Sequence, residues 1–423
     1  MKKICLLICF IMLMGIGLTG CGTSENVSKE GPEEVTLTFL MHDQFQYEYF
    51  TETNNISEAY KKVNPNVTIE VEKVKDTGEL ENALKIRNSA NELPDIMLLK
   101  TYMLSNFADI LEPLNDTQVA KNNEYAEQYS IGGNIVGIPE SAFYEFVYYR
   151  KSVFEKYGLE IPETWDEFMK TAQLIKEKGE YIPIVLGAKD SWPDYPYNEF
   201  MPCLQGGNGA YWNEMATKDE PFTKGEPFYE AYRKIQDLYD AKVFGQDPLG
   251  IGWDQAKSMF VAGKGAMIGA GQWFITDYKN MDGDMDDLGL FLLPVRDTKE
   301  DTFYATVMAD GFYGTAKEGE NKEEAIKFIN WYMSSDYYLE YMKEKGINAT
   351  IKGSEPTNPY LKEAFENTDA KFIVYDGGNK EFKRIGDSFG FDVKKLGQEM
   401  LAGKDFEEMM SNLNKRWKEA KNE

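Results

Sequence analysis

Few side chains in this sequence could carry out covalent catalysis. The 423 residues include one histidine, His42, and four cysteines, of which only Cys203 lies beyond the first 21 residues. A single histidine argues against a histidine-based triad and against a metal site built from several histidines, unless His42 itself serves. A lone cysteine is more often a packed small residue than a nucleophile. The 71 acidic residues leave a pair of catalytic carboxylates possible, but most of them are expected to be surface charges.

The composition fits a binding function better than an enzymatic one. Aromatic residues make up 14% of the chain, and many fall at predicted strand ends and loops. Sugars present C–H faces that lie flat on tryptophan or tyrosine rings, and hydroxyls that pair with Asp, Glu, Asn and Arg. The net charge of −25 argues against nucleic acid or an anionic lipid surface as the main partner.

Residues 137–192 are the most regular part of the chain. Residues 147–149 are β-branched or aromatic, which suits a buried strand. Capping-box spacing at residues 152–155 and 164–167 predicts two helix starts, and residues 184–186 read as the next buried strand. The order of strand, helix and strand predicts a βαβ unit of an α/β domain.

Other strands are predicted where apolar residues alternate or cluster, near 35–41, 67–71, 93–99, 265–271 and 288–295. Lys100, Thr101 and Tyr102 come directly after the third of these strands. In open α/β sheets, ligands bind at the carboxyl ends of the strands. A chain of this length normally forms two domains, each with ample core.

The same stretch resembles a known family. Residues 137–168 read G-I-P, then Y-Y-R-K-x-x-F-x-K-x-G-L, then P-x-T-W-D-E-F. This motif is similar to the signature region of extracellular solute-binding proteins of ABC importers, in the carbohydrate-type group that includes maltose-binding protein. Arg150 stands where the family usually has Asn. Further matches are L-P-D-I at 93–96, L-E-P-L at 111–114 and the glycine-rich segment 265–273 that ends in Trp273, so the resemblance spans essentially the whole mature chain.

The resemblance implies an α/β fold of two discontinuous lobes joined by a hinge of crossovers, the type II periplasmic-binding-protein arrangement. Crossovers are expected near residues 143, 264 and 311. The expected division places residues 35–143 and 264–311 in lobe 1. It places residues 144–263 and 312–423 in lobe 2.

The N-terminus predicts export and a lipid anchor. Two lysines precede an apolar run at 4–17 that is short for a membrane span, and Leu-Thr-Gly-Cys at 18–21 matches a lipobox. Residues 1–20 are therefore expected to be a lipoprotein signal peptide and residues 21–34 a flexible tether. The resemblance implies that Cys21 becomes the first mature residue and is lipidated, which places the protein at the extracytoplasmic face of the cell membrane. The alternative is an ordinary secretory signal that happens to end in cysteine.

The resemblance also implies ligand contacts, position by position. They are Asp43, Gln44, Lys100, Tyr102, Glu140, Phe143, Tyr144, Asp190, Trp192, Trp273, Asp310 and Phe312, with Asp387 and Phe389 as weaker candidates. Each has a plainer alternative: Trp192 and Trp273 could fill a core, Tyr144 could face solvent, and His42 could be a hydrogen-bonded residue at a strand end.

The function that the resemblance implies is that of a lipid-anchored, monomeric substrate-binding component of an ABC transporter. It would capture a carbohydrate, with an oligosaccharide favoured, between its lobes and deliver it to permease subunits in the membrane. It would carry out no covalent chemistry and need no cofactor, metal or nucleic acid. Two alternatives remain open: a surface lipoprotein enzyme that degrades glycans, and the same fold serving a peptide, a metal or another non-sugar solute.

Overall fold

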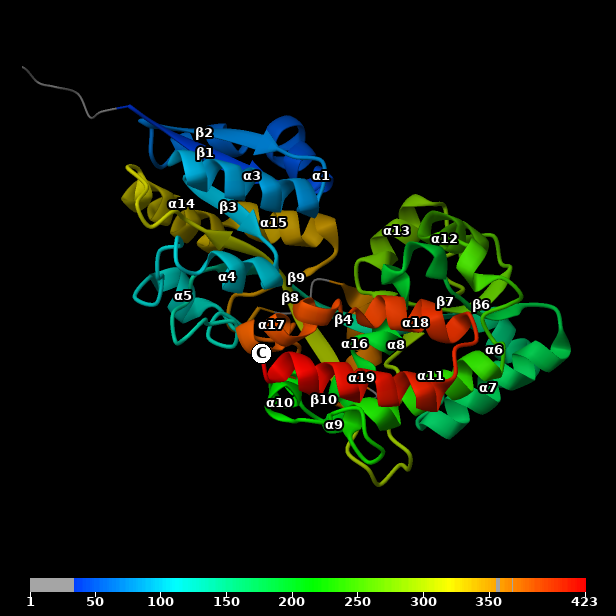
Figure 1. Ribbon diagram of the computed structural model, residues 1–423. Coiled ribbons are helices and arrows are strands. Elements are labelled where there is room, and N and C mark those ends of the chain that lie inside the picture. Colours follow the sequence, from blue (N-terminus) through cyan, green and yellow to red (C-terminus); the bar gives the residue numbers. More distant parts are fainter. Residues whose placement is uncertain (1–33, 355–357, 367) are drawn as a thin grey trace, which may run out of the picture.

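Two long strands form the middle of the molecule. The computed structural model describes residues 34–354, 358–366 and 368–423. Strand β4 (Ile138–Arg150) pairs antiparallel with strand β8 (Tyr304–Gly314). Both strands run from one half of the molecule into the other (Figure 1). The strands follow the order β2-β1-β3-β8-β4-β6-β5 across the sheet, so β4 and β8 connect the strands of the two halves.

The first half is built on three parallel strands, β1 (Val35–Met41), β2 (Val67–Lys73) and β3 (Ile96–Leu99). Strand β3 pairs antiparallel with the end of β8. Its helices are α1 (Gln44–Glu48), the π-helix Tyr49–Thr53, α2 (Ile56–Lys61), α3 (Thr77–Ala90), α4 (Thr101–Phe107), α5 (Gln118–Asn122), α14 (Lys322–Ser334) and α15 (Asp336–Lys345).

The second half surrounds the far end of β4. Strand β6 (Gly265–Gly271) pairs antiparallel with β4 and parallel with β5 (Ile182–Val185), and β7 (Leu288–Phe291) also pairs with β4. Strand β10 (Lys371–Val374) pairs parallel with the start of β8, and the short β9 (Asn348–Ala349) pairs antiparallel with Ser141 and Ala142 of β4.

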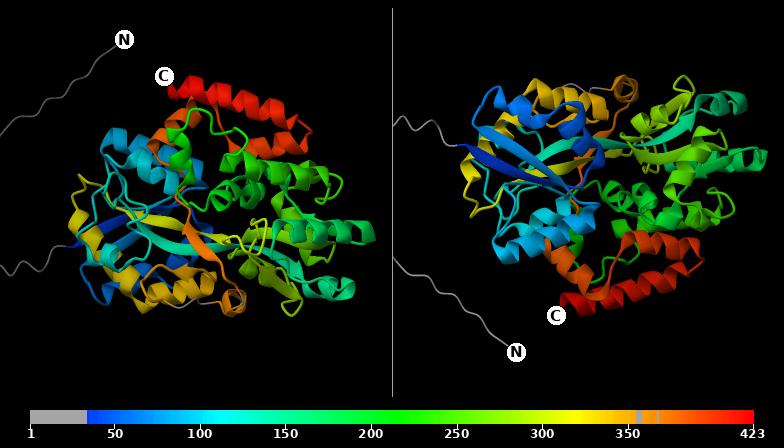
Figure 2. Two further views of the ribbon diagram at one scale, coloured as in Figure 1. Left: turned by 90° about the horizontal axis from the view of Figure 1, so that it is seen from below. Right: turned by 90° about the horizontal axis from the view of Figure 1, so that it is seen from above.

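Many helices cover this half (Figure 2). They are α6 (Lys151–Tyr157), α7 (Trp165–Lys178), α8 (Tyr195–Asn198), α9 (Met201–Gly206), α10 (Tyr211–Thr217), α11 (Pro227–Asp240), α12 (Trp253–Val261), α13 (Phe274–Asn280), α16 (Pro359–Glu366), α17 (Lys380–Phe389), α18 (Val393–Leu401) and α19 (Phe406–Lys421), with 3₁₀ turns at Ala188–Asp190, Trp192–Asp194 and Pro248–Gly250. In the part of the chain described here, no helix is long and apolar enough to cross a membrane.

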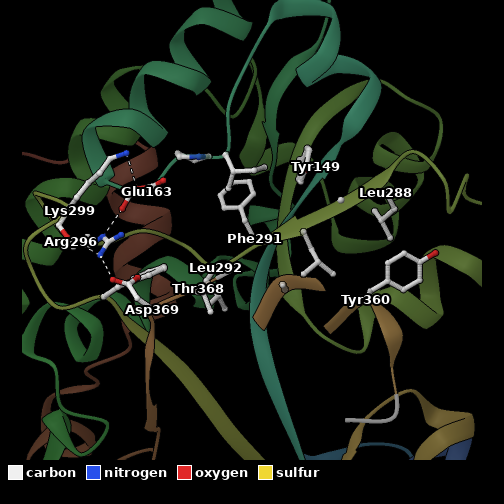
Figure 3. A pocket seen from close by; sticks show the side chains of 16 residues that line it. Tyr149, Glu163, Leu288, Phe291, Leu292, Arg296, Lys299, Tyr360, Thr368 and Asp369 are labelled. Atoms are coloured by element: carbon white, nitrogen blue, oxygen red, sulfur yellow. Dashed lines mark hydrogen bonds and ion pairs between the residues drawn. The ribbon is translucent and has the colours of Figure 1, made fainter. Parts of the chain in front are cut away.

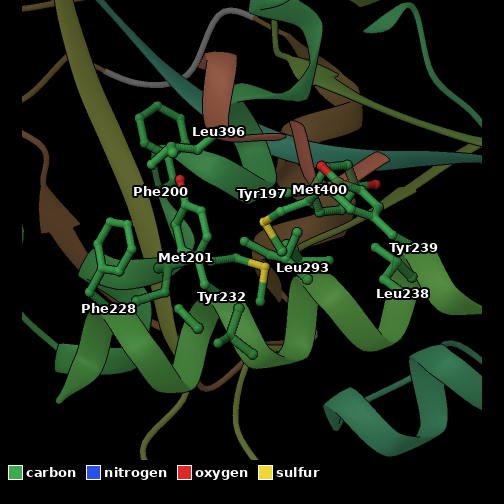
Figure 4. Close-up of a cluster of buried hydrophobic side chains, with 14 of the residues drawn as sticks. Tyr197, Phe200, Met201, Phe228, Tyr232, Leu238, Tyr239, Leu293, Leu396 and Met400 are labelled. Atoms are coloured by element: carbon green, nitrogen blue, oxygen red, sulfur yellow. The ribbon is translucent and has the colours of Figure 1, made fainter. Parts of the chain in front are cut away.

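Each half has its own apolar core. In the first half, side chains of β1 and α14 such as Phe39 and Phe328 pack together. In the second half, α9, α11 and α18 contribute to a larger core that includes Met201, Tyr232 and Met400 (Figure 4). The C-terminal helix buries one apolar face in this core, made by Phe406, Met409, Met410, Leu413 and Trp417.

The predicted division into lobes differs from this packing. Residues 264–311 were expected with the first half, but β6 and β7 find their hydrogen-bond partners in β4 and β5. Residues 312–349 were expected with the second half, but the apolar faces of α14 and α15 pack against the β1–β3 side. Figure 1 shows these two helices beside the N-terminal strands. Strand pairing and burial of helix faces therefore set the two halves.

The predicted βαβ unit is wrong in its strand arrangement. Strand β6 lies between β4 and β5, and it runs antiparallel to β4 and parallel to β5, so the two predicted strands are neither adjacent nor parallel. The helix start at Thr164 is confirmed, because its Oγ1 accepts a 3.3 Å hydrogen bond from the Glu167 N–H. The predicted capping box at Ser152 is replaced by a contact with Asp287. The Asp287 carboxylate accepts hydrogen bonds from the Ser152 N–H (2.7 Å) and from the Ser152 hydroxyl (3.0 Å).

Candidate functional site

Three predicted site residues come together at the ends of strands in the first half. Asp43 follows β1, Lys100 follows β3, and Asp310 lies on β8, the neighbour of β3. The Lys100 ammonium lies 2.6 Å from the Asp310 carboxylate, and Lys345, at the end of α15, lies 2.9 Å from the Asp43 carboxylate. We call these four residues and His42 the charged group. Strands β1 and β3 end at one edge of the sheet, where the strand-end rule places ligands, and β8 runs past the end of β3 and brings Asp310 to the same place.

The charged group is close to neutral overall. Burial and the nearby Lys100 lower the pKa of His42 to about 4, so this imidazole is neutral at pH 7. Burial would raise the pKa of Asp43 and of Asp310, but Lys345 and Lys100 respectively hold both pKa values below the usual range. Two ion pairs and a neutral histidine leave no uncompensated charge in the group. Across the described residues, no cluster of three or more His, Cys, Asp or Glu side chains could hold a metal ion.

Three tryptophans form a continuous aromatic surface in the second half. The ring centroids of Trp192 and Trp253 lie 5.1 Å apart, those of Trp253 and Trp273 5.5 Å, and those of Trp192 and Trp273 6.1 Å. Trp192 and Trp273 are partly exposed, whereas Trp253 is 8% exposed and supports them. The predicted site residue Asp190 accepts a 2.6 Å hydrogen bond from the backbone N–H of Trp253 and so fixes the start of α12. We call the three rings the tryptophan group.

A carboxyl group that the sequence reasoning missed lies beside the tryptophan group. The Tyr195 hydroxyl lies 2.6 and 2.7 Å from the two oxygens of Glu145, and the Tyr195 ring stacks on Trp192. Burial raises the pKa of Glu145 well above its usual range, and the nearby Glu199 adds to the shift. Glu145 directly follows the predicted Tyr144, so position within the signature was the one signal that could have found it.

The two groups are joined by hydrogen bonds between α15 and the start of α13. The Thr276 hydroxyl donates to the Lys345 carbonyl at 3.3 Å, and the Gln272 amide donates to the Gly346 carbonyl at 2.9 Å. Trp273 lies in the chain between these two donors, and Lys345 belongs to the charged group. The charged group and the tryptophan group therefore border the same junction between the halves.

The structure places two predicted contacts in the core instead. Glu140 is 1% exposed, and its carboxylate accepts hydrogen bonds from Gln46, from the Tyr313 hydroxyl at 2.5 Å and from the Tyr332 hydroxyl at 3.0 Å. Phe312 is fully buried and packs edge-on against a tyrosine ring. Neither side chain is available to a ligand, because burial and internal partners already occupy it.

The other predicted contacts have partners outside the two groups. Gln44 is exposed and hydrogen-bonds within α1. Phe143 is buried, and Tyr144 packs against phenylalanine rings of α16 and β10 rather than facing open solvent. Tyr102 is half-buried, and its carbonyl accepts a 3.4 Å hydrogen bond from Lys383 of α17, which is another contact between the halves.

The weaker candidates and Cys203 do not join the site. Asp387 and Phe389 lie on α17, where the phenylalanine ring packs against α19. Cys203 is buried in α9, and burial raises the pKa of its thiol well above the usual range, which suits a packed residue. Cys21 lies outside the described residues.

A separate pocket of about 490 Å³ lies in the second half (Figure 3). Tyr149, Phe291 and Tyr360 line it, and the ion pair of Arg296 with Asp369 lies at its side. It contains none of the predicted contacts and neither of the two groups. We therefore take the junction with the charged and tryptophan groups as the candidate ligand site.

Comparisons with known proteins agree with this architecture. A family model described as bacterial extracellular solute-binding protein matches residues 45–338. The multiple sugar-binding protein of Streptococcus mutans is 25% identical over 380 residues, which cover 85% of this chain and 88% of that protein. The melibiose/raffinose/stachyose-binding protein MelE of Bacillus subtilis is 23% identical over 202 residues, 46% of each chain.

Solved structures share the fold. Apo RafE from Streptococcus pneumoniae superposes with a TM-score of 0.77 at 23% identity, covering 93% of this chain and 100% of that one. The protein BlMnBP1 of Bifidobacterium animalis subsp. lactis, in complex with mannobiose, superposes with a TM-score of 0.75 at 23% identity. The match covers 92% of this chain and 95% of that one. The predicted fold class, two α/β lobes of the type II binding-protein kind, is confirmed by this likeness.

Proposed function

This chain belongs to the family of bacterial extracellular solute-binding proteins, and from that premise we propose that it captures an oligosaccharide for an ABC importer. The relatives named for sugars support a carbohydrate ligand. Import through such a system requires permease subunits in the membrane as partners. The protein acts by binding and release, and it carries out no covalent step.

The observation that carries the proposal is the exposed part of the tryptophan group beside the charged group. A pyranose C–H face placed on Trp273 or Trp192 replaces two hydrated apolar surfaces with one contact, and the π face of the ring adds an electrostatic attraction. Hydroxyl groups at the rim of the sugar can then pair with the carboxylates and ammonium groups of Asp43, Lys100 and Asp310. A flat aromatic surface with a few placed polar groups is typical of sugar sites.

The two halves act as lobes that close on the ligand. The packing supports a first lobe made of residues 35–140 and 310–350. It supports a second lobe made of residues 142–308 and 358–423. Strands β4 and β8 connect them, and Gly311 on β8 has a φ of +67°, a conformation that glycine adopts without strain. A hinge of two strands can absorb small dihedral changes while each core stays intact.

Binding without turnover is the direct test of this function. Isothermal titration calorimetry with raffinose, stachyose, melibiose, mannotriose and maltotriose is expected to show saturable binding of at least one of these sugars. Chromatography of the same samples after prolonged incubation is expected to return that sugar unchanged. Small-angle scattering is expected to show a smaller radius of gyration for the complex. Product that accumulates with time would favour a glycan-degrading enzyme instead, and heat from none of the sugars would point to a non-sugar solute.

We expect the mature protein to be held at the membrane through Cys21. The charged start, the apolar run and the lipobox at residues 1–21 support this anchor. The Cys21→Ser variant lacks the thiol that would carry the lipid, so it is expected in the culture medium or as an unprocessed precursor. Immunoblots of membrane and medium fractions measure this. A variant of mature size that stays in the membrane fraction would show that the anchor lies elsewhere.

A further inference from the structure

We infer that Glu145, held in place by Tyr195, is a specificity-determining residue that binds adjacent hydroxyl groups of the sugar ring stacked on the tryptophan group. This inference rests on the proposed function, because it names the ligand groups that one part of that site recognises. Neither residue was among the contacts that the sequence predicted.

Glu145 differs from Asp43 and Asp310 in having no cation beside it. Asp43 and Asp310 each pair with a lysine, at 2.9 and 2.6 Å. No lysine or arginine within residues 34–354, 358–366 and 368–423 lies at ion-pair distance from Glu145, and its hydrogen-bond partner there is the Tyr195 hydroxyl. A partly buried carboxyl group with one donor for two oxygens retains acceptor capacity for a ligand.

Gly271 allows Glu145 and Trp273 to lie close together. Glu145 lies on β4 directly opposite Gly271 on β6. A β-carbon at position 271 would lie 3.1 Å from the Glu145 Oε1 and would also meet the indole nitrogen edge of Trp273. Glycine at this position therefore lets the carboxyl group and the indole lie side by side. A sugar ring on Trp273 would present its edge hydroxyls toward Glu145.

Tyr195 fixes the direction of this carboxyl group. Its hydroxyl lies 2.6 and 2.7 Å from the two oxygens, so it restrains both at once. Its ring stacks on Trp192, with centroids 6.2 Å apart and planes 28° apart, and packs edge-on against Phe200. Tyr195 therefore couples the orientation of the carboxyl group to the tryptophan group, and it is a positioning residue.

The charges of the site indicate which ligand groups it accepts. Both lysines of the charged group are already paired with carboxylates, so nothing there favours a uronic acid or a sulfated sugar. A carboxyl group that can accept two hydrogen bonds matches two neighbouring hydroxyls of a neutral sugar. An amino sugar, whose ammonium could also pair with Glu145, is the competing chemistry that the experiment must separate.

The test measures the affinities of wild type and four variants for raffinose and mannotriose by calorimetry. Glu145→Ala is expected to raise the dissociation constant of the sugar that binds by about 10- to 100-fold, because hydrogen bonds to a carboxylate are lost. Glu145→Gln keeps one acceptor and is expected to lose less, about 3- to 10-fold. The dissociation constant of Tyr195→Phe is expected to lie between those of wild type and Glu145→Ala. The matched control is Glu407→Gln, which alters an equivalent carboxylate–tyrosine hydrogen bond (Tyr229 to Glu407, 2.6 Å) at the start of α19. The affinity of this variant is expected to stay unchanged.

Monodeoxy forms of the bound sugar separate recognition from a structural role. Wild type is expected to bind at least one deoxy form about 10-fold more weakly than the parent sugar. Glu145→Ala is expected to bind that deoxy form and the parent sugar with similar affinity, because the missing hydroxyl has no partner in this variant. If every deoxy form loses the same factor in both proteins, Glu145 is a structural residue and the inference is wrong. Tighter binding of a glucosamine disaccharide than of either neutral sugar would also overturn it. No binding of any neutral sugar by wild type would overturn the proposed function, and this inference with it, whereas wild-type binding with unchanged Glu145→Ala affinity overturns the inference alone.

Discussion

Trp273→Ala is expected to weaken sugar binding by about 30- to 1000-fold, which corresponds to about 2–4 kcal/mol. The ring is partly exposed and packs on Trp192 and Trp253, so it is part of a surface rather than of a closed core. Its truncation removes the flat apolar face on which we expect the sugar to lie. The empty protein is expected to lose much less unfolding free energy than the roughly 3–5 kcal/mol of a buried aromatic residue. Calorimetry of binding and urea unfolding of the ligand-free protein measure the two quantities on one variant.

Trp417→Ala is the matched control for this prediction. Trp417 is fully buried on α19, and its indole N–H donates to the Lys218 carbonyl at 3.1 Å. Its truncation is expected to lower the unfolding free energy by about 3–5 kcal/mol and to leave the affinity of the folded fraction intact. The opposite pattern for Trp273→Ala, a large loss of stability with unchanged affinity, would remove Trp273 from the ligand site.

The local structure around helix ends could be read from the sequence. The helix start at Thr164 lies where the capping-box spacing predicts it, and α6 and α7 end at the left-handed glycines Gly158 and Gly179, as local sequence rules favour. These features depend on a few neighbouring residues. The arrangement of the strands could not be read in this way. The pairing of β6 with β4 joins residues more than 100 positions apart, and no local pattern records it.

The charged group was predictable in part because strand ends are easy to locate. Asp43 and Lys100 each follow a clear strand, so their closeness follows from two parallel neighbours. The ion pairs were not predictable, because Lys345 meets Asp43 across 302 residues of sequence. The hydrogen bonds of α15 to Gln272 and Thr276, which join the two groups, also lie outside any local pattern.

The burial of Glu140 and Phe312, which the sequence did not indicate, has a common cause. A strand with one exposed face alternates between apolar and polar residues, and this alternation shows which side chains face the core. Strand β4, which contains Glu140, is buried at its first six positions, and β8, which contains Phe312, is buried at its last four, so neither sequence alternates there. The family motif placed both residues near the ligand, but Glu140 turns toward three donors inside the first half. The resemblance located these strands but did not show which of their side chains face the core and which face the ligand.

Asp194→Asn is expected to raise the unfolding free energy at pH 7 by up to about 4 kcal/mol. Asp194 is fully buried, and within the described residues its carboxyl oxygens have no partner in good hydrogen-bond geometry, although the Asn198 amide lies beside them. Burial raises its pKa to about 8, with Asn198 and Lys394 opposing the shift and Glu199 adding to it. The helix α18 packs directly over this carboxyl group, because a β-carbon on Gly397 would collide with it. An amide of the same shape removes the cost of keeping a carboxyl group protonated at neutral pH.

The direction of the pH dependence follows from proton binding. Between the unfolded pKa of about 4 and the folded pKa of about 8, the folded protein holds a proton on Asp194 that the unfolded chain has released. The stability contributed by this proton is fully present below pH 4 and is lost as the pH rises toward 8, by about 1.4 kcal/mol per pH unit. Other buried carboxyls titrate as well, so the informative quantity is the difference in unfolding free energy between wild type and Asp194→Asn.

Urea unfolding of both proteins from pH 5 to pH 8 measures that difference. It is expected to widen steadily with pH, and Asp254→Asn, whose side chain is 97% exposed on α12, is expected to show a small difference that does not change with pH. A constant gap between wild type and Asp194→Asn would mean that Asp194 titrates alike in the folded and unfolded chains. In that case water must reach the carboxyl group beneath α18, because a charged carboxylate without a partner is tolerated inside a protein only where it is hydrated.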